Sequence, residues 1–151
     1  MRHLVGLVAQ TPHRAVVSMG PQYEQIELAE NMSGAEFLPQ PEVLPHADLV
    51  ITHGGNNTVT ECLHFGKPMV VLPLFWDQYD NAQRVQELGL GVRLAPYELA
   101  GPELHDAIER LLGDAALVEL LGRIAARLQA TPGTFRAADL IGRLTTGFPT
   151  G

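Results

Sequence analysis

The chain has little cysteine, few aromatic residues and a deficit of positive charge. Its 151 residues include one Cys, five Phe, three Tyr and one Trp, and 10 Lys and Arg stand against 17 Asp and Glu. A single cysteine excludes an internal disulfide and a cysteine-based metal cluster. The net charge of −7 argues against a nucleic-acid backbone or an anionic membrane surface as the partner. Since Cys62 falls inside an expected helix, we interpret it as a small, buried apolar residue.

Long hydrophobic runs are missing as well. The apolar run near the N-terminus, Leu4–Ala9, is six residues long, too short for the core of a signal peptide and far too short to cross a bilayer. We therefore expect a cytoplasmic protein without a membrane span. The histidines other than His53 lack the spacing of metal ligands, so we expect no metal site.

What the sequence does contain is typical of a folded domain rich in turns. Hydrophobic residues make up 46% of the chain, together with 15 Gly and 11 Pro. That composition fits a globular α/β protein and not a disordered segment. The length is enough for one domain with a hydrophobic core and short for two.

Short apolar runs alternate with helical patterns. The runs predict strands at Ala15–Met19, Leu49–Thr52, Met69–Leu72 and Val92–Leu94. The helical patterns lie at Arg2–Gln10, Gln22–Ala29, Asn57–Phe65, Gln78–Leu88, Pro102–Leu112, Ala115–Gln129 and Thr134–Leu144. Most of the runs are almost continuously apolar, as in parallel strands that are covered on both faces. The alternation therefore predicts a Rossmann-like parallel sheet flanked by helices.

We expect the domain to cover residues 1–144, and the residues 145–151, rich in Thr, Gly and Pro, to form a flexible tail. The helical pattern at Arg2–Gln10 is not preceded by a strand. A doubly wound sheet would then lack its first strand, as expected for a fragment of a larger protein. Such a fragment should expose a sheet edge and tend to self-associate.

A candidate anion site follows the strand Leu49–Thr52. The strand ends at His53, the pair Gly54-Gly55 lets the backbone come close to a ligand, and the next helix begins near Asn56 or Asn57. Helix N-termini at the carboxyl ends of parallel strands bind anions through their free amides. The alternative is an ordinary turn in which an asparagine is the N-cap of the helix.

Two acidic residues are candidates for binding sugar hydroxyls. Glu61 shares a helix face with Asn57 and Thr58, where its carboxylate would accept from a ribose. The alternative is a capping box formed by Thr58 and Glu61. Asp77 and Gln78 follow the next strand and supply acceptors and donors for a hexose. The alternative for Asp77 is the N-cap of the following helix.

The stretch Gly89-Leu90-Gly91 is similar to part of a dinucleotide-binding motif. It follows a helix and enters a strand, which is the reverse of a phosphate-binding turn, and the third glycine is absent. We therefore place a nicotinamide-dependent Rossmann domain last among the alternatives.

Together, these motifs resemble the donor-binding signature of the UDP-glycosyltransferase superfamily, which has the GT-B fold. The residues that carry the resemblance are Phe37-Leu38-Pro39-Gln40, Val43–Asp48, His53–Glu61, Gly66-Lys67-Pro68, Pro73 and Asp77–Ala82. The match is close from Phe37 to Leu94 and keeps the family's order, so it outweighs the local alternatives. It implies that the chain is the C-terminal, donor-binding half of a GT-B glycosyltransferase.

The resemblance also implies roles for the matching residues. The residues expected to bind the nucleotide and its diphosphate are Phe37, Gln40, His53, Gly55, Asn57, Thr58 and Glu61. Of these, Phe37 would stack on the base and Glu61 would hold the ribose. Asp77 and Gln78 are expected to bind the sugar. The Asn-Thr turn favours a UDP-sugar over a dTDP-sugar, and no separate cofactor is expected.

In the family, an N-terminal domain binds the acceptor and carries the catalytic base, usually a histidine. The present sequence does not match that domain. We therefore expect no catalytic residue in this chain, which should bind the nucleotide sugar without transferring it alone. The expected partner is an acceptor-binding N-terminal domain or, as the alternative, a separate acceptor-binding subunit.

Overall fold

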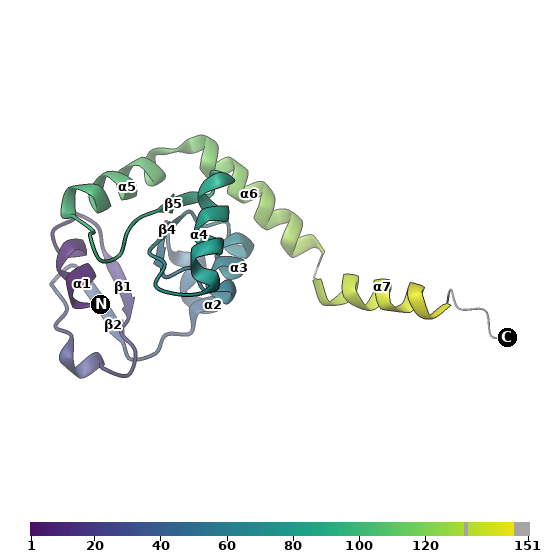
Figure 1. Ribbon diagram of the computed structural model, residues 1–151, viewed down its shortest axis with the longest axis horizontal. Coiled ribbons are helices and arrows are strands. Elements are labelled where there is room, and N and C mark those ends of the chain that lie inside the picture. Colours follow the sequence, from purple (N-terminus) through teal and green to yellow (C-terminus); the bar gives the residue numbers. More distant parts are fainter. Residues whose placement is uncertain (132, 147–151) are drawn as a thin grey trace.

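Parallel strands and helices alternate in the computed structural model, which describes residues 1–131 and 133–146 (Figure 1). The strands are β1 (Ala15–Ser18), β2 (Met32–Ala35), β3 (Val50–Thr52), β4 (Met69–Val71) and β5 (Gly91–Arg93). The helices are α1 (Arg2–Val8), α2 (Gln40–Val43), α3 (Asn56–Phe65), α4 (Asp77–Glu87), α5 (Gly101–Gly113), α6 (Ala115–Ala130) and α7 (Gly133–Thr146). Short 3-10 helices, η1 (Tyr23–Gln25) and η2 (Leu44–His46), lie between them.

The strands form parallel pairs in two separate sets. β1 pairs with β2, while β3, β4 and β5 pair in that order. In the second set Val50 lies opposite Met69, and Met69 lies opposite Gly91. Among the described residues, no strand pairs with the remaining edge of β1 or of β3. The predicted α/β class with parallel strands flanked by helices is confirmed, and the strands are divided into two sets.

The hydrophobic core is centred on β4. Met69, Val70 and Val71 are all 0% exposed. α5 packs against β4, α4 packs against β5, and α3 packs against α6. Because β4 is buried and β3 pairs with it, the carboxyl ends of the two strands lie side by side, and the turns that lead to α3 and α4 start there.

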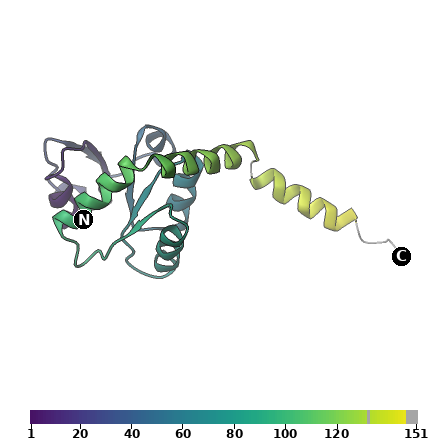
Figure 2. The same cartoon turned by 90° about the horizontal axis from the view of Figure 1, so that it is seen from above.

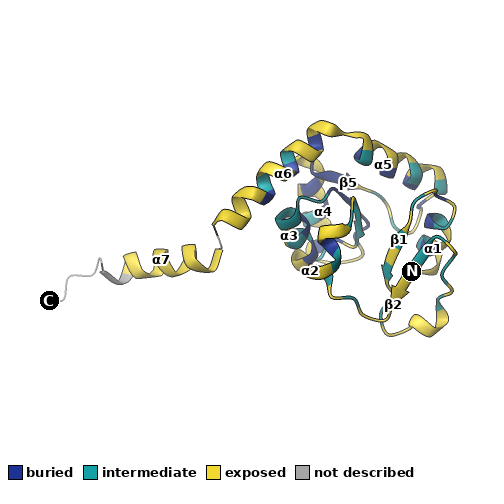
Figure 3. Ribbon diagram, turned by 180° about the vertical axis from the view of Figure 1, so that it is seen from behind, coloured by how far each residue is buried: buried dark blue, intermediate teal, exposed yellow. Residues whose placement is uncertain are grey.

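The last two helices lead away from the core. α6 buries Leu117, Leu121 and Ala125 on one side, and α7 continues beyond it, away from the rest of the protein (Figures 1 and 2). The described side chains of α7 are exposed along the helix (Figure 3). Of the tail predicted at 145–151, residues 145 and 146 belong to α7, and residues 147–151 lie outside the described part of the chain.

The segment between β1 and β2 differs from the prediction. The helix expected at Gln22–Ala29 is wrong, because only Tyr23–Gln25 form a short 3-10 turn. No residue of that turn is buried, so it lacks the apolar face by which packing stabilises a helix. Strand β2 was not predicted. Its sequence, Met-Ser-Gly-Ala, is poor in the branched and aromatic residues typical of strands, and it forms through its pairing with β1.

Candidate functional site

Glycine shapes the turn between β3 and α3. Gly54 has a φ of 86°, in the left-handed region that glycine tolerates best. A Cβ at this position would lie 2.6 Å from Cγ1 of Val71 on β4. The Gly54 N–H donates to Thr52 Oγ1 at 3.2 Å. The turn therefore lies tightly against the end of β4, at the carboxyl edge of the sheet.

His53 and Gly55 meet at the start of α3. A Cβ on Gly55 would lie 2.6 Å from His53 Nε2, so any larger residue would have to displace the imidazole. Gly55 is the N-cap of the helix, and His53 is exposed. These two predicted site residues are thus brought together, with a ring nitrogen beside the N-cap of α3.

The first turn of α3 presents free backbone amides. The helix begins at Asn56, and an intrahelical bond of 3.0 Å joins Val59 N to Gly55 O. The amides of residues 56–58 have no acceptor within the helix, and the helix dipole favours an anion beside them. The Asn57 side chain is exposed on the same turn. Since the N-cap is Gly55, the alternative of an asparagine cap is wrong.

Thr58 and Gln40 are joined across two helices. Thr58 is 8% exposed, and its hydroxyl lies 3.3 Å from Nε2 and 3.5 Å from Oε1 of Gln40 on α2. The Thr58 hydroxyl is therefore engaged within the protein, which leaves the backbone amide as the free donor of this residue. The contact brings Gln40, another predicted site residue, next to the first turn of α3.

Glu61 has a buried oxygen with no partner. In the described part of the chain, Glu61 Oε2 is the one buried side-chain oxygen or nitrogen without a hydrogen bond. A capping box would require Thr58 as the N-cap, whereas Thr58 lies inside the helix, so this alternative is wrong. Leaving a buried acceptor unpaired costs about 1–3 kcal/mol. A ligand that donates a hydrogen bond would remove that cost.

Cys62, next to Glu61, is a core residue. It is 0% exposed, which confirms the prediction of a buried cysteine. Burial, and to a lesser extent the charge of Glu61, raises the pKa of the Cys62 thiol from 9.0 to about 12. The thiol therefore stays protonated at neutral pH and does not act as a nucleophile.

Gln78 supports the loop between β4 and α4. Its side chain is 4% exposed, and its Oε1 accepts from the N–H groups of Leu74 at 2.9 Å and Phe75 at 3.2 Å. The next residue in the loop, Trp76, has a φ of 52°, the one positive φ of a non-glycine residue in the described structure. The buried amide of Gln78 thus stabilises a strained turn that leaves the Trp76 indole 84% exposed.

Asp77 is the first residue of α4 and is exposed. The N-cap is Trp76, so the alternative of an Asp77 cap is wrong. The Asp77 Oδ2 accepts from Asn81 Nδ2 at 3.3 Å, and the same nitrogen donates to Gly54 O at 2.9 Å. Asn81 was not among the predicted site residues. Its place four residues after Asp77, on the same helix face, is the signal that points to it.

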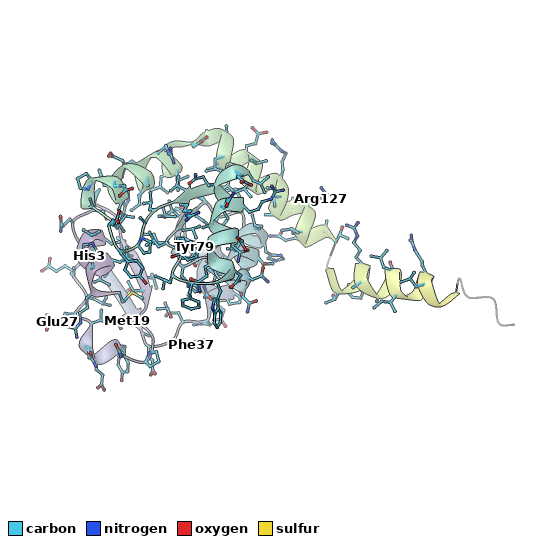
Figure 4. The ribbon with its side chains drawn as sticks, viewed as in Figure 1. His3, Met19, Glu27, Phe37, Tyr79 and Arg127 are labelled. Carbon is cyan, nitrogen blue, oxygen red and sulfur yellow. The ribbon has the colours of Figure 1, made fainter. Side chains whose placement is uncertain are left out.

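Phe37 lies on the segment that leads from β2 to α2 (Figure 4). Its side chain is 79% exposed, so a face of the ring is accessible for stacking on a flat ligand. It comes three residues before Gln40, and the two therefore enter the site from the same connection.

A separate hollow lies beyond the carboxyl end of β5. It has a volume of about 460 Å³, and its walls include Tyr79, Arg93 and Tyr97. The Arg93 guanidinium lies 5.3 Å from the centre of the Tyr79 ring, a cation–π contact. None of the predicted site residues lines this hollow. The α3 turn, which has free amides and is followed one helical turn later by the unpaired Glu61 oxygen, remains the candidate site.

Neither a group of metal-ligand side chains nor a membrane-spanning helix is found in the part of the chain that the structure describes. No group of three His, Cys, Asp or Glu side chains within it has a metal-binding arrangement. No helix within it combines the length and the apolar character needed to cross a bilayer.

The fold and the polar α3 turn define an α/β domain of the kind found in GT-B glycosyltransferases. The solved glycotransferase of kitacinnamycin has a TM-score of 0.83 and 36% identity, over 93% of this chain and 37% of that chain. The glycosyltransferase VinC, solved in complex with dTDP, has a TM-score of 0.78 and 25% identity, over 95% of this chain and 37% of that one.

Sequence comparison then identifies the family. The model of the erythromycin biosynthesis protein CIII-like C-terminal domain matches residues 2–142, and the chain belongs to this family. The predicted resemblance to the donor-binding domain of UDP-glycosyltransferases is thereby confirmed.

Glycosyltransferases longer than this chain are among the relatives. The NDP-glycosyltransferase YjiC of Bacillus subtilis (strain 168) is 34% identical over 128 residues, which is 83% of this chain and 33% of the relative. Demethyllactenocin mycarosyltransferase of Streptomyces fradiae is 36% identical over 114 residues, which is 76% of this chain and 25% of the relative. The chain thus spans a third or less of the length of these two relatives.

Proposed function

We propose that the chain is the donor-binding half of an inverting glycosyltransferase, which moves a hexose from a nucleotide sugar, with a UDP-sugar favoured, to an acceptor hydroxyl. The observation that carries the proposal is the buried, unpartnered oxygen of Glu61, one turn into a helix whose first amides are free. Buried acceptors are nearly always paired. The two adjacent hydroxyls of a ribose would supply donors to this carboxylate.

The diphosphate would bind at the first turn of α3. The backbone amides there, the exposed Asn57 side chain and the His53 ring beside the N-cap would supply donors. The absence of a side chain at Gly55 lets both the imidazole and a phosphate approach the N-cap. In this arrangement His53 is a ligand of the diphosphate.

The base and the sugar would lie on either side of the diphosphate. Phe37 would stack on the base, and Gln40, held by Thr58, would lie near the base or ribose. On the other side, the Asp77 carboxylate would accept from the sugar hydroxyls. Gln78 would contribute through Nε2 alone, since its Oε1 already accepts from two loop amides.

Transfer with inversion needs a base that none of these residues supplies. In the proposed reaction, a base outside this chain removes the proton from the acceptor hydroxyl, and the hydroxyl oxygen attacks the anomeric carbon. The bond from that carbon to the phosphate oxygen breaks, and its electron pair leaves with the nucleoside diphosphate. The α3 N-terminus and His53 would stabilise the charge that develops on the leaving group.

The partner would be an acceptor-binding N-terminal domain of the same protein or, alternatively, a separate acceptor-binding subunit. The coverage of relatives, 33% for YjiC, supports a missing remainder. We also propose that this remainder supplies a parallel strand between β1 and β3, each of which has an unpaired edge in the described structure. In agreement with this, Val16 on β1 is 57% exposed, although it is apolar and lies within a strand.

A thermal-shift titration with UDP, dTDP, UDP-glucose and NAD tests the donor site. UDP and UDP-glucose should raise the melting temperature, and NAD should not. At a ligand concentration of 100 Kd the stabilisation is about 2.7 kcal/mol, which is easily measured. dTDP is the second candidate, because VinC was solved in complex with it. A shift with NAD alone, or with none of the four ligands, would contradict a preformed nucleotide-sugar site.

A further inference from the structure

Asn81 connects the two sides of the proposed donor site. It lies on α4, and its Nδ2 group donates to the carbonyl oxygen of Gly54 at 2.9 Å and to Asp77 Oδ2 at 3.3 Å. A side-chain amide nitrogen carries two hydrogens, and both have an acceptor here. One acceptor belongs to the turn that begins α3, and the other belongs to the first turn of α4.

The two acceptors differ in how freely they can move. The Gly54 turn is fixed, because it is packed against Val71 and its N–H is bound to Thr52. The Asp77 carboxylate is exposed, and the bond from Asn81 is its one hydrogen bond to the described residues. Without Asn81, the Asp77 side chain would be free to change rotamer.

We infer that Asn81 is a positioning residue that holds the sugar-binding carboxylate of Asp77 at a set place relative to the diphosphate site at α3. The inference rests on the proposed function, since it assigns Asp77 to the sugar and the α3 turn to the diphosphate. Asn81 itself contacts neither ligand. It acts through Asp77: because the carboxylate is already held in one orientation, less conformational entropy is lost when the sugar binds.

The proposed role requires a side chain of the size of asparagine at position 81 that donates hydrogen bonds. Asn81→Asp has the same size but no hydrogen to donate, and it places a second carboxylate beside Asp77 and the Gly54 carbonyl. Asn81→Ala removes both bonds without adding charge. Gln83→Ala is a matched control, since Gln83 on the same helix donates its amide to Glu87, four residues away, at 2.8 Å, but lies outside the proposed site.

The experiment measures dissociation constants for UDP and UDP-glucose by calorimetry and uses their ratio as the sugar contribution. Asp77→Ala should remove most of the sugar contribution and leave the part that Gln78 supplies. Asn81→Ala should reduce it about fivefold, the effect of one ordinary hydrogen bond, and Asn81→Asp should reduce it at least as much. In the Asp77→Ala background, Asn81→Ala should leave the ratio unchanged, because Asn81 acts through that carboxylate. Gln83→Ala should leave the ratio at the wild-type value.

Several outcomes would overturn the inference. An unchanged ratio in Asn81→Ala, or an equal loss of affinity for both ligands, would show that Asn81 has no role in sugar binding beyond its support of the fold. A reduced ratio that persists in the Asp77→Ala background would show that it does not act through Asp77. A wild-type chain that binds no nucleotide, or that gains nothing from the sugar, would instead contradict the proposed function itself.

A measurement on the free protein guards against misfolded variants. In ¹⁵N-edited NMR spectra the two side-chain amide protons of Asn81 give separate signals. Asp77→Ala, an exposed substitution, should move one of the two signals strongly and leave the partner bonded to Gly54 near its original position. If neither signal moves, the hydrogen bond to Asp77 is absent and the inference fails.

Discussion

Glu61→Gln distinguishes a ribose-binding carboxylate from one that supports the fold. The substitution keeps the size of the side chain and replaces the carboxylate, one of whose oxygens is buried without a partner, by a neutral amide. In the free protein that oxygen has left water without gaining a donor, which lowers stability. The change removes this charge and breaks no hydrogen bond seen in the described structure. We therefore expect the free variant to melt at the wild-type temperature or above it.

Although the stability of Glu61→Gln should be unchanged or higher, its affinity for the nucleotide should be lower. A hydrogen bond to a charged group is worth about 1.5–3 kcal/mol, which corresponds to a roughly 10- to 150-fold increase in Kd when it is lost. Glutamine retains one carbonyl oxygen that can accept from a hydroxyl, so we expect the effect on UDP to lie near the lower end of that range. The 2′-deoxy form of UDP lacks one of the two hydroxyls and should bind the wild type more weakly than UDP does.

Calorimetric titration of both proteins with both nucleotides provides the assay. The difference in affinity between UDP and 2′-deoxy-UDP should be smaller for Glu61→Gln than for the wild type, because the variant holds the hydroxyl less well. Glu103→Gln, an exposed change of the same chemistry on α5, serves as the control and should alter neither affinity. A lower melting temperature with unchanged UDP affinity would refute the ribose role of Glu61.

Three further predictions follow from the geometry. His53→Ala should raise the Kd for UDP about 5- to 10-fold with little change in melting temperature, since the ring is exposed; unchanged affinity in the folded variant would exclude contact with the diphosphate. Gln78→Leu should lower the free energy of unfolding by about 1–3 kcal/mol, because the amides of Leu74 and Phe75 lose their acceptor, and urea denaturation would measure this. Because the pKa of Cys62 rises from 9.0 to about 12 on folding, its contribution to stability is complete below pH 9 and falls as the pH rises from there towards 12. Unfolding curves at pH 8 and above 10, compared between wild type and Cys62→Ala, would detect this slope, and parallel behaviour of the two proteins would contradict it.

Local sequence signals predicted the elements around the site well. β3, α3, β4 and α4 were expected to within a residue or two, because each apolar run is followed by a helix with glycine at its end. β2 could not be predicted in this way, since its strand conformation comes from pairing with β1, which is remote in sequence.

The roles of individual side chains were harder to predict. From the sequence, Thr58 and Glu61 could also form a capping box, and Asp77 could also be an N-cap. The caps are decided by where each helix begins. α3 begins directly after the Gly54 turn, with Gly55 as its N-cap, and α4 begins after the loop that ends at Trp76. The engagement of Gln78 with the loop amides likewise depends on a backbone path that no residue pattern specifies.

The two sets of strands carry different parts of the proposed donor site: one carries the base-stacking Phe37, and the other carries the groups for the diphosphate and the sugar. His53, Glu61 and Asp77, proposed for the diphosphate, ribose and sugar, follow β3 and β4, which pair directly, so their relative positions do not depend on β1 and β2. Phe37 follows β2, which belongs to the other set of strands. If a strand from the rest of the protein pairs with both β1 and β3, it will fix the distance between Phe37 and the α3 turn. We therefore expect this chain to bind pyrophosphate nearly as well as the chain joined to the proposed N-terminal domain does, and to gain less from the attached uridine. Equal gains from uridine in the two forms, measured by calorimetry, would show that β1 and β2 are already held in place without the additional strand.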